Sequence, residues 1–429
     1  MTRKSLLIAG LLSFSLVAFA GEDLKSLSLK EAQEIAIKNH PRITAAELKA
    51  LASKQVVREV RSGFFPTVTA NVTAVGTTED NTRIAAGGLN NPLILNRNAE
   101  GINVTQLITD FGRTANLVAS SKLHARAEEE SSLATRAQIM FQVDAAYFNA
   151  LQAQSVLQVA RQTVETRRLL FDLVNEMATN NLKSGLDVSF AKVSLEEGNL
   201  LLSKANNELQ SAFANLSILL GHREQQNFQL IEESIVPNPK VDTSLLVEEA
   251  LRNRPELARL RFETEAAGKQ VKAEKALHYP TISAIGSAGI IPIHDPQLKG
   301  DYAAAGVNLS IPIFDGMLFS AREKEARLKA KAIEENLRDE ENNVIRDVRV
   351  AGLNLNFAGE RVTLTAKLLE SAAEAFDLAQ ARYKVGSSSI VELSQAQLSK
   401  TQAEIAQANA KFDYHLQKAI LDYQTGQLR

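Results

Sequence analysis

Two acidic residues occupy equivalent positions in two similar segments of the chain. Asp187 ends the segment LKSGLD, and Glu392 ends the segment YKVGSSSIVE, 392 − 187 = 205 positions later. A carboxylate at such a place can cap the helix that follows, because the first turn of a helix attracts negative charge. If several copies of the chain met there, the same carboxylates would form a ring that favours cations. The sequence therefore predicts either a pair of helix caps or a charged constriction.

Other kinds of chemistry find little support in the sequence. The chain has no cysteine, and its six histidines are dispersed without an H-x-x-x-H pair, so we expect no metal site. It also lacks a G-x-S-x-G nucleophile motif and a phosphate-binding loop. The formal net charge of −2 gives no general attraction for nucleic acid. We therefore expect a protein that is not an enzyme, needs no cofactor and does not bind nucleic acid.

Two copies of a common plan surround the acidic residues. Pro66 and Pro280 are 280 − 66 = 214 positions apart, in FFPTVTANVTA and HYPTISAIGSA, and the preceding segments AIKNHPRI and ALRNRPEL match at the same offset. After each proline the helical pattern changes to alternating apolar and polar residues, which is typical of a strand. INVT and GVNLSI show the same alternation further along each copy. The sequence thus predicts a duplicated chain with four strands.

A very long helix is expected to follow the strands of each copy. The stretch from Arg113 to Ser184 contains neither glycine nor proline, and a helix of this length would extend roughly 108 Å. Its equivalent in the second copy is Met317 to Val385. Each long helix should turn at a tip and return as a second helix, near Ala191 to Gly221 and Ala396 to Gly426. Such Ala-rich, charge-laced helices suit coiled-coil packing.

The N-terminus has the pattern of a secretory signal peptide. Arg3 and Lys4 precede an apolar run that ends with small residues at Ala20, and this run is short for a membrane-spanning helix. We therefore assign a signal peptide to residues 1–20, a first structural repeat to 21–226, a linker to 227–240 and a second repeat to 241–429.

Four amphipathic strands are too few to close a membrane barrel, which needs about eight. An open sheet edge in lipid would leave backbone groups without partners, so copies of the chain must associate, as a dimer or a trimer. Aromatic residues gather where the strands meet the helices: Phe64, Phe65, Phe111, Tyr279 and Phe314. They are expected to form an aromatic girdle at one bilayer interface, or alternatively to cap the core at this junction.

These motifs together resemble the TolC-type outer membrane efflux protein family. The resemblance is carried by SLKEAQEIAIKNHPRI and its second copy, by QLITDFGR and SIPIFDG, and by the segment from Gly386 to Gln397. It implies a mainly α fold with a small β part. Duplicated long helical hairpins would form a periplasmic α-barrel, and a homotrimer would build an outer membrane β-barrel of 3 × 4 = 12 strands. Such proteins are exit ducts of efflux or type I secretion systems.

The resemblance also implies partners and a gate. The partners are a periplasmic adaptor protein, an inner-membrane transporter and outer membrane lipid. The gate lies at the hairpin tips, where Tyr383 would pair with Asp187 and Glu392 would join the carboxylate ring. Gln395 stands where relatives carry a second acidic ring, and Ser388 stands where an arginine can occur. Both departures are expected to weaken cation binding and closure.

Adaptor contact is expected at the tips, at Gly185, Gly386 and Ser387, because they lie farthest from the membrane. Alternatively, the two glycines only end helices, since glycine tolerates the turns that a side chain disfavours. The loops between paired strands, Thr77 to Asn98 and Ile291 to Ala304, are expected to face the cell exterior.

A different class of function remains open at this point. A periplasmic coiled-coil scaffold without channel activity would explain the helices and the signal peptide, but not the four alternating strands. A secreted lipid-binding amphipathic protein would predict basic polar faces and no duplication. The sequence does not name the cargo, because drugs, metals and proteins leave through the same kind of duct.

Overall fold

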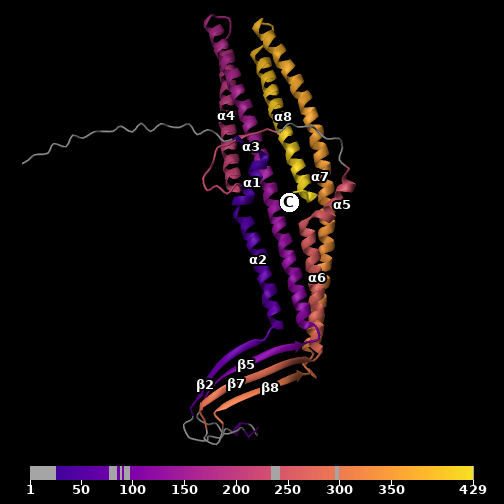
Figure 1. Ribbon diagram of the computed structural model, residues 1–429. Coiled ribbons are helices and arrows are strands. Elements are labelled where there is room, and N and C mark those ends of the chain that lie inside the picture. The colour runs from indigo at the N-terminus through magenta and orange to yellow at the C-terminus, as the bar shows by residue number, and fades with distance from the viewer. Residues whose placement is uncertain are drawn as a thin grey trace, which may run out of the picture.

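A computed structural model describes residues 26–76, 85–86, 89–90, 97–232, 242–294 and 299–428. The predicted signal peptide, most of the predicted linker and most of the Thr77 to Asn98 loop lie outside these residues. The molecule is elongated: helices run along its length, and a small sheet occupies one end (Figure 1). None of the helices within the described residues combines the length and hydrophobicity that a membrane span needs.

The duplicated plan predicted from the sequence is present. The first copy consists of α1 (Leu29–Asn39), α2 (Pro41–Arg61), β2 (Thr67–Val75), β5 (Arg97–Thr109), α3 (Arg113–Thr179) and α4 (Gly185–Leu219). The second consists of α5 (Thr243–Asn253), α6 (Pro255–Lys275), β7 (Thr281–Ile293), β8 (Asp301–Ser310), α7 (Leu318–Lys384) and α8 (Ile390–Gln424). The described residues also form two short 3-10 helices, η1 (Ser62–Phe64) and η2 (Ala276–His278), and four two-residue strands: β1 (Ser26–Leu27), β3 (Ala85–Ala86), β4 (Leu89–Asn90) and β6 (Gln229–Leu230).

The long helices α3 and α7 have 67 residues each, which corresponds to about 100 Å. Equivalent aspartates lie three residues before their first residues. Asp110 accepts a hydrogen bond from the Thr114 N–H at 2.7 Å, and Asp315 accepts one from the Phe319 N–H at 2.8 Å. These bonds satisfy N–H groups that the first helical turn leaves without an internal partner. Helix α7 agrees with prediction within a residue, but α3 ends at Thr179 instead of Ser184.

The sheet is antiparallel, with the strand order β2-β5-β7-β8. Its register places Ala70 beside Ile102 and Ile102 beside Ala288, whereas Thr69 lies beside Asn103 and Asn103 beside Ser287. One face is therefore apolar and the other polar, because successive side chains point to opposite faces. Strands β2 and β8 are the two edges.

The predicted loop Ile291 to Ala304 is shorter than expected. Strand β7 continues to Ile293 and β8 begins at Asp301, and the Ile291 N–H donates to the Gly300 carbonyl at 2.7 Å. The loop is shorter because Asp301 to Ala305 pair with β7, so small residues extend the strand instead of the loop.

The helices form a layer whose order changes at mid-length. In the half near the sheet, α3 packs against α2 and α6, and α6 packs against α7; in the other half, α3 packs against α4 and α8, and α8 against α7. Helices α1 and α5 lie beside α3 and α7 where this change occurs (Figure 1). The outer members of the layer are thus α2 and α4 on one flank and α7 on the other.

Candidate gate at the hairpin tips

The first tip joins α3 to α4 and holds Asp187 as a helix cap. Asn181 follows the end of α3 in the left-handed conformation, with φ 56°. Ser184 precedes α4, and the Asp187 carboxylate accepts from the Ser184 N–H at 2.9 Å and its hydroxyl at 2.7 Å. These hydrogen bonds lower the pKa of Asp187 below its ordinary value. The carboxylate is therefore engaged within its own loop.

The second tip joins α7 to α8 with the same backbone and different charges. Gly386 takes the left-handed conformation, with φ 76°, and the Ser387 N–H donates to the Arg382 carbonyl at 2.9 Å. The Glu392 N–H donates to the Ser389 hydroxyl at 3.2 Å, and its carboxylate accepts from Arg382 Nη1 at 3.0 Å. Glu392 thus forms an ion pair with Arg382, whereas Asp187 is influenced by the charge of Lys183 without an ion pair among the described residues.

The role expected of Gly185 as a turn residue was wrong. Gly185 is the first residue of α4, and only Gly386 of the two tip glycines has a positive φ. The residue equivalent to Gly386 is Asn181, since 386 − 181 = 205. Asparagine also tolerates the left-handed conformation, so the first turn does not need a glycine. Gly185 nevertheless stays at the tip, where it is exposed.

Tyr383 lies beneath the tips, in a small apolar core shared by both hairpins. This joint core, as we call it, consists of Val174, Ala191, Phe376, Ala379, Tyr383, Ile390 and Leu393. Tyr383 is 1% exposed, and burial, followed by the negative charge of Asp187, raises its pKa. Its hydroxyl has no hydrogen-bond partner in the described residues. The structure therefore brings Tyr383 near Asp187 without the hydrogen bond that the sequence suggested.

A residue that sequence reasoning missed contacts Tyr383. The Lys183 ammonium lies 4.3 Å from the centroid of the Tyr383 ring, a distance that allows a cation–π interaction. Lys183 belongs to the loop before α4, whereas Tyr383 belongs to α7. The available signal was a difference between the repeats, because Ser388 occupies the position equivalent to Lys183 (183 + 205 = 388).

The other predicted tip residues are accessible. Ser387 and Gln395 are exposed and Ser388 is half-buried, and the Ser387 hydroxyl donates to the Arg382 carbonyl at 3.1 Å. Within the described part of the chain, no group of three or more His, Cys, Asp or Glu side chains is arranged to hold a metal.

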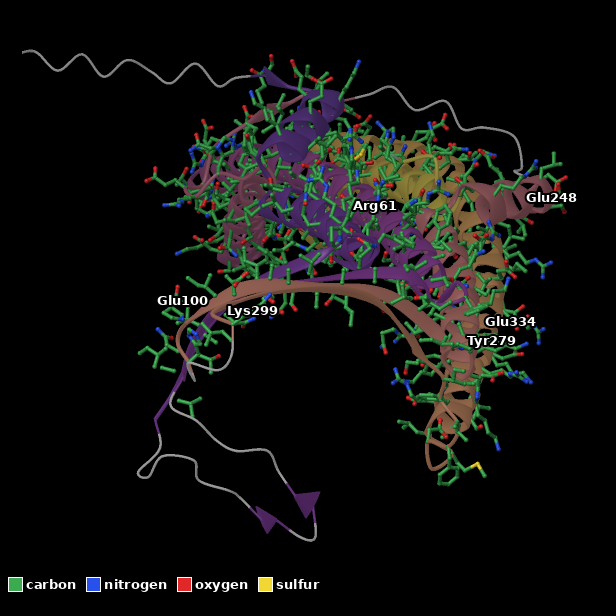
Figure 2. The ribbon with its side chains drawn as sticks, turned by 60° about the horizontal axis from the view of Figure 1, so that its bottom comes forward. Arg61, Glu100, Glu248, Tyr279, Lys299 and Glu334 are labelled. Carbon is green, nitrogen blue, oxygen red and sulfur yellow. The ribbon has the colours of Figure 1, made fainter. Side chains whose placement is uncertain are left out.

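The aromatic residues predicted to form a girdle are all exposed and lie where the strands meet the helices. Tyr279, labelled in Figure 2, precedes β7, and its ring centroid lies 6.0 Å from that of Phe111. Phe64 and Phe65 precede β2, and Phe314 lies between β8 and α7. Their placement agrees with the girdle hypothesis, whose membrane role stays a prediction.

This geometry defines a class of protein: an elongated molecule of duplicated helical hairpins that carries an open amphipathic sheet at one end. The model of the family "Outer membrane efflux protein" matches residues 33–222 and 246–427. The chain therefore belongs to the outer membrane efflux protein family. It is a channel protein of the outer membrane that extends into the periplasm, and the alternative of a periplasmic scaffold is not supported.

Individual relatives agree with this assignment. The chain is 23% identical to the outer membrane protein TolC of Escherichia coli strain K12 over 340 residues, which cover 74% of this chain and 69% of TolC. It is 22% identical to TolC of Salmonella enteritidis over 404 residues, covering 91% and 80% of the two chains.

Solved structures show the same fold. A crystal structure of CusC matches with a TM-score of 0.81 and 19% identity, covering 93% of this chain and 92% of CusC. The outer membrane protein VceC of Vibrio cholerae matches with a TM-score of 0.79 and 17% identity, covering 93% and 96%. The predicted fold class is confirmed.

Proposed function

We propose that three copies of this chain form a passive exit duct through the outer membrane and across the periplasm. Their sheets close into one barrel, and their helices form a tunnel that continues it. A periplasmic adaptor protein joins the tunnel to an inner-membrane transporter, which supplies the energy. Two repeats, residues 21–226 and 241–429, joined by the linker 227–240, build each third of the duct.

The observation that carries this proposal is the match between the two flanks of a single chain. One flank consists of β2, α2 and α4, and the other consists of β8 and α7. Both edge strands lack a second partner within the described sheet. An open edge is not viable in lipid, so β2 of one copy is expected to pair with β8 of the next.

The helices of the same flanks expose apolar side chains. Helix α7 exposes Val350, Leu353, Phe357, Leu364, Leu368 and Leu378. The opposite flank exposes Leu186, Phe190, Val193 and Leu200 on α4, and Leu48, Leu51 and Val56 on α2. Many of these residues recur at steps of three, four or seven, the spacing with which helices pack side by side in coiled coils. Flank-to-flank association of three copies would bury both stripes and both sheet edges together.

The gate remains part of this proposal. A threefold axis would gather three copies of Asp187 and three of Glu392 at the inner end of the tunnel, with Gln395 and Ser388 nearby. Arg382 pairs with Glu392, so half of the proposed ring is already neutralised. The tips around Gly185, Gly386 and Ser387 are the proposed adaptor contacts, and the five junction aromatics are the proposed girdle.

Arginine substitutions on the two faces of one strand test the duct. Ile102→Arg places a charge on the apolar face, where it would cost about 2–4 kcal/mol in the middle of a bilayer, and Asn103→Arg is the matched control on the polar face. We expect Ile102→Arg to reduce recovery of the protein in the outer membrane fraction. Asn103→Arg should insert, and it should change ion selectivity in planar bilayers. Equal insertion of both variants without any conductance would reject the duct.

Removal of Arg382 tests the carboxylate ring. In Arg382→Gln, Glu392 regains a free negative charge, so the cation preference of the channel should rise. The change should be modest, because an exposed ion pair is worth about 0–1 kcal/mol. Reversal-potential measurements in a salt gradient would show it. Lys384→Gln removes a positive charge from the same tip but leaves the Arg382–Glu392 ion pair in place, and a shift of equal size there would argue against the ring.

A further inference from the structure

The two hairpins of one chain meet at the joint core, and the repeats differ at one residue within this core and at one residue beside it. Lys183 in the first loop is equivalent to Ser388 in the second loop. Ala178 in the first long helix is equivalent to Tyr383 in the second long helix (178 + 205 = 383). Lys183 and Tyr383 therefore each occur in one repeat without a counterpart of the same type in the other. Each hairpin contributes one member of a pair that only their contact completes.

The contact between these two residues crosses from one hairpin to the other. Lys183 lies in the loop of the α3–α4 hairpin, and its ammonium is seated 4.3 Å from the centre of the Tyr383 ring on α7. A similar contact exists seven residues earlier on α7, where the Lys400 ammonium lies 4.9 Å from the Phe376 ring centroid. Lys400 belongs to α8, so that second contact stays within the α7–α8 hairpin.

Among the described residues, the polar groups near the tips do not form hydrogen bonds from one hairpin to the other. The Asp187 carboxylate accepts from Ser184 in its own loop, and the Glu392 carboxylate accepts from Arg382 in its own hairpin. The Tyr383 hydroxyl is buried without a hydrogen-bond partner in the described residues. What Tyr383 offers to the first hairpin is therefore the face of its ring.

We propose that Lys183 is the latch of the gate: its ammonium, seated on the Tyr383 ring, holds the first hairpin loop against the second hairpin and keeps the tip closed. The proposal rests on the proposed function, since it concerns the gate of that duct. Lys183 acts as a positioning residue, because it sets the separation of the two hairpins. The aromatic face binds the cation electrostatically, and this attraction strengthens as the pair is withdrawn from water.

The latch makes a clear distinction between the ring and the hydroxyl of Tyr383. Tyr383→Phe keeps the ring face and should keep most of the closure. Tyr383→Leu removes the ring while retaining an apolar side chain for the joint core, and it should release the loop. In a gate held by a hydrogen bond from the hydroxyl, both variants would open alike.

Hydrogen–deuterium exchange on the purified full-length protein tests the latch without requiring conductance. In Lys183→Gln, amides of residues 180–188 should exchange about 3- to 30-fold faster, the factor that corresponds to the usual strength of such a contact. Lys183→Arg should restore slow exchange. Lys400→Gln is the matched control, because its contact lies within one hairpin, and it should leave exchange at 180–188 unchanged.

Single-channel conductance of the same variants in planar bilayers then connects the contact to the gate. Lys183→Gln should raise the open fraction, and Lys183→Arg should reverse the effect. Unchanged exchange in Lys183→Gln would overturn the latch, whatever the conductance. Faster exchange with no change in the open fraction would also overturn it, as would loss of closure in Tyr383→Phe equal to that in Tyr383→Leu. Failure of every variant and of the wild type to conduct would instead reject the duct.

Discussion

The middles of the two long helices use the same backbone and fasten it differently. Tyr147 on α3 is equivalent to Gly352 on α7, since 352 − 147 = 205. The Tyr147 hydroxyl lies 2.8 Å from the carbonyl oxygens of both Leu27 and Ile231 and accepts from the Ile231 N–H at 3.1 Å. At Gly352, an added Cβ would overlap the Thr243 methyl group, so α5 lies directly against α7.

This difference shows how a duplicated chain adapts. In the first repeat, Ser26–Leu27 and Gln229–Leu230 pair as β1 and β6, and the buried tyrosine forms hydrogen bonds with the backbone at this pair. Among the described residues, no strand pair occupies the equivalent place in the second repeat. At the ends of the return helices, both repeats keep the same residue: Gly221 and Gly426 both have positive φ and lie against Asn39 and Asn253, the last residues of α1 and α5.

The largest expected effect on stability comes from substitutions of Tyr147. Tyr147→Ala removes a fully buried aromatic side chain, which typically costs about 3–5 kcal/mol, and it should lower the thermal unfolding temperature. Tyr147→Phe isolates the hydroxyl and should cost about 0.5–1.5 kcal/mol, because it removes a hydrogen bond while the Ile231 N–H still donates to the Leu27 carbonyl. If Tyr147→Phe unfolds at the wild-type temperature, the hydroxyl does not fasten the two segments.

The close packing of α5 on α7 at Gly352 should be sensitive to an added methyl group. Gly352→Ala places a methyl group against Thr243 and should cost about 1–3 kcal/mol. Thr243→Ser removes the opposing methyl group, so the double variant should recover most of the loss in unfolding temperature. Gly268→Ala is the control, because an added Cβ there meets nothing within 4 Å; it should be neutral or stabilising. A double variant no better than Gly352→Ala would show that α5 is not the obstacle.

Exchanging the turn residues of the two tips should have a smaller effect on stability. Asn181→Gly removes the strain of a side chain in the left-handed conformation and should stabilise the turn by about 0.5–1 kcal/mol. Amide exchange at the first tip should therefore become slower. Gly386→Asn should do the reverse at the second tip. Effects of the same sign at both tips would contradict the equivalence of the two turns.

The smallest expected effect concerns the pH dependence of the Asp187 cap. Its pKa is lower in the folded protein, so the cap contributes fully above the unfolded value of about 3.9. The contribution is lost as the pH falls through the lower, folded value. Wild type should therefore retain its protection of the first tip relative to Asp187→Asn at about pH 4. A difference that is already halved at that pH would exclude a lowered pKa.

Local patterns predicted most of the fold, and contacts between distant segments account for what they missed. The alternation after Pro66 and Pro280 and the lack of breakers in 113–184 were sufficient for the strands and long helices. The end of α3 was missed because Asn181 replaced the expected glycine. The Lys183–Tyr383 and Tyr147–Leu27 contacts join residues 200 and 120 positions apart (383 − 183 and 147 − 27), and no local pattern indicates which residues will meet.

The mass of the native complex tests the central claim most directly. Wild-type protein would be extracted from outer membranes in mild detergent and weighed by native mass spectrometry, and the same preparation would be inserted into planar bilayers. The account predicts that the species that conducts ions contains three copies of the chain, joined by their matching flanks. A conducting monomer or dimer would contradict it.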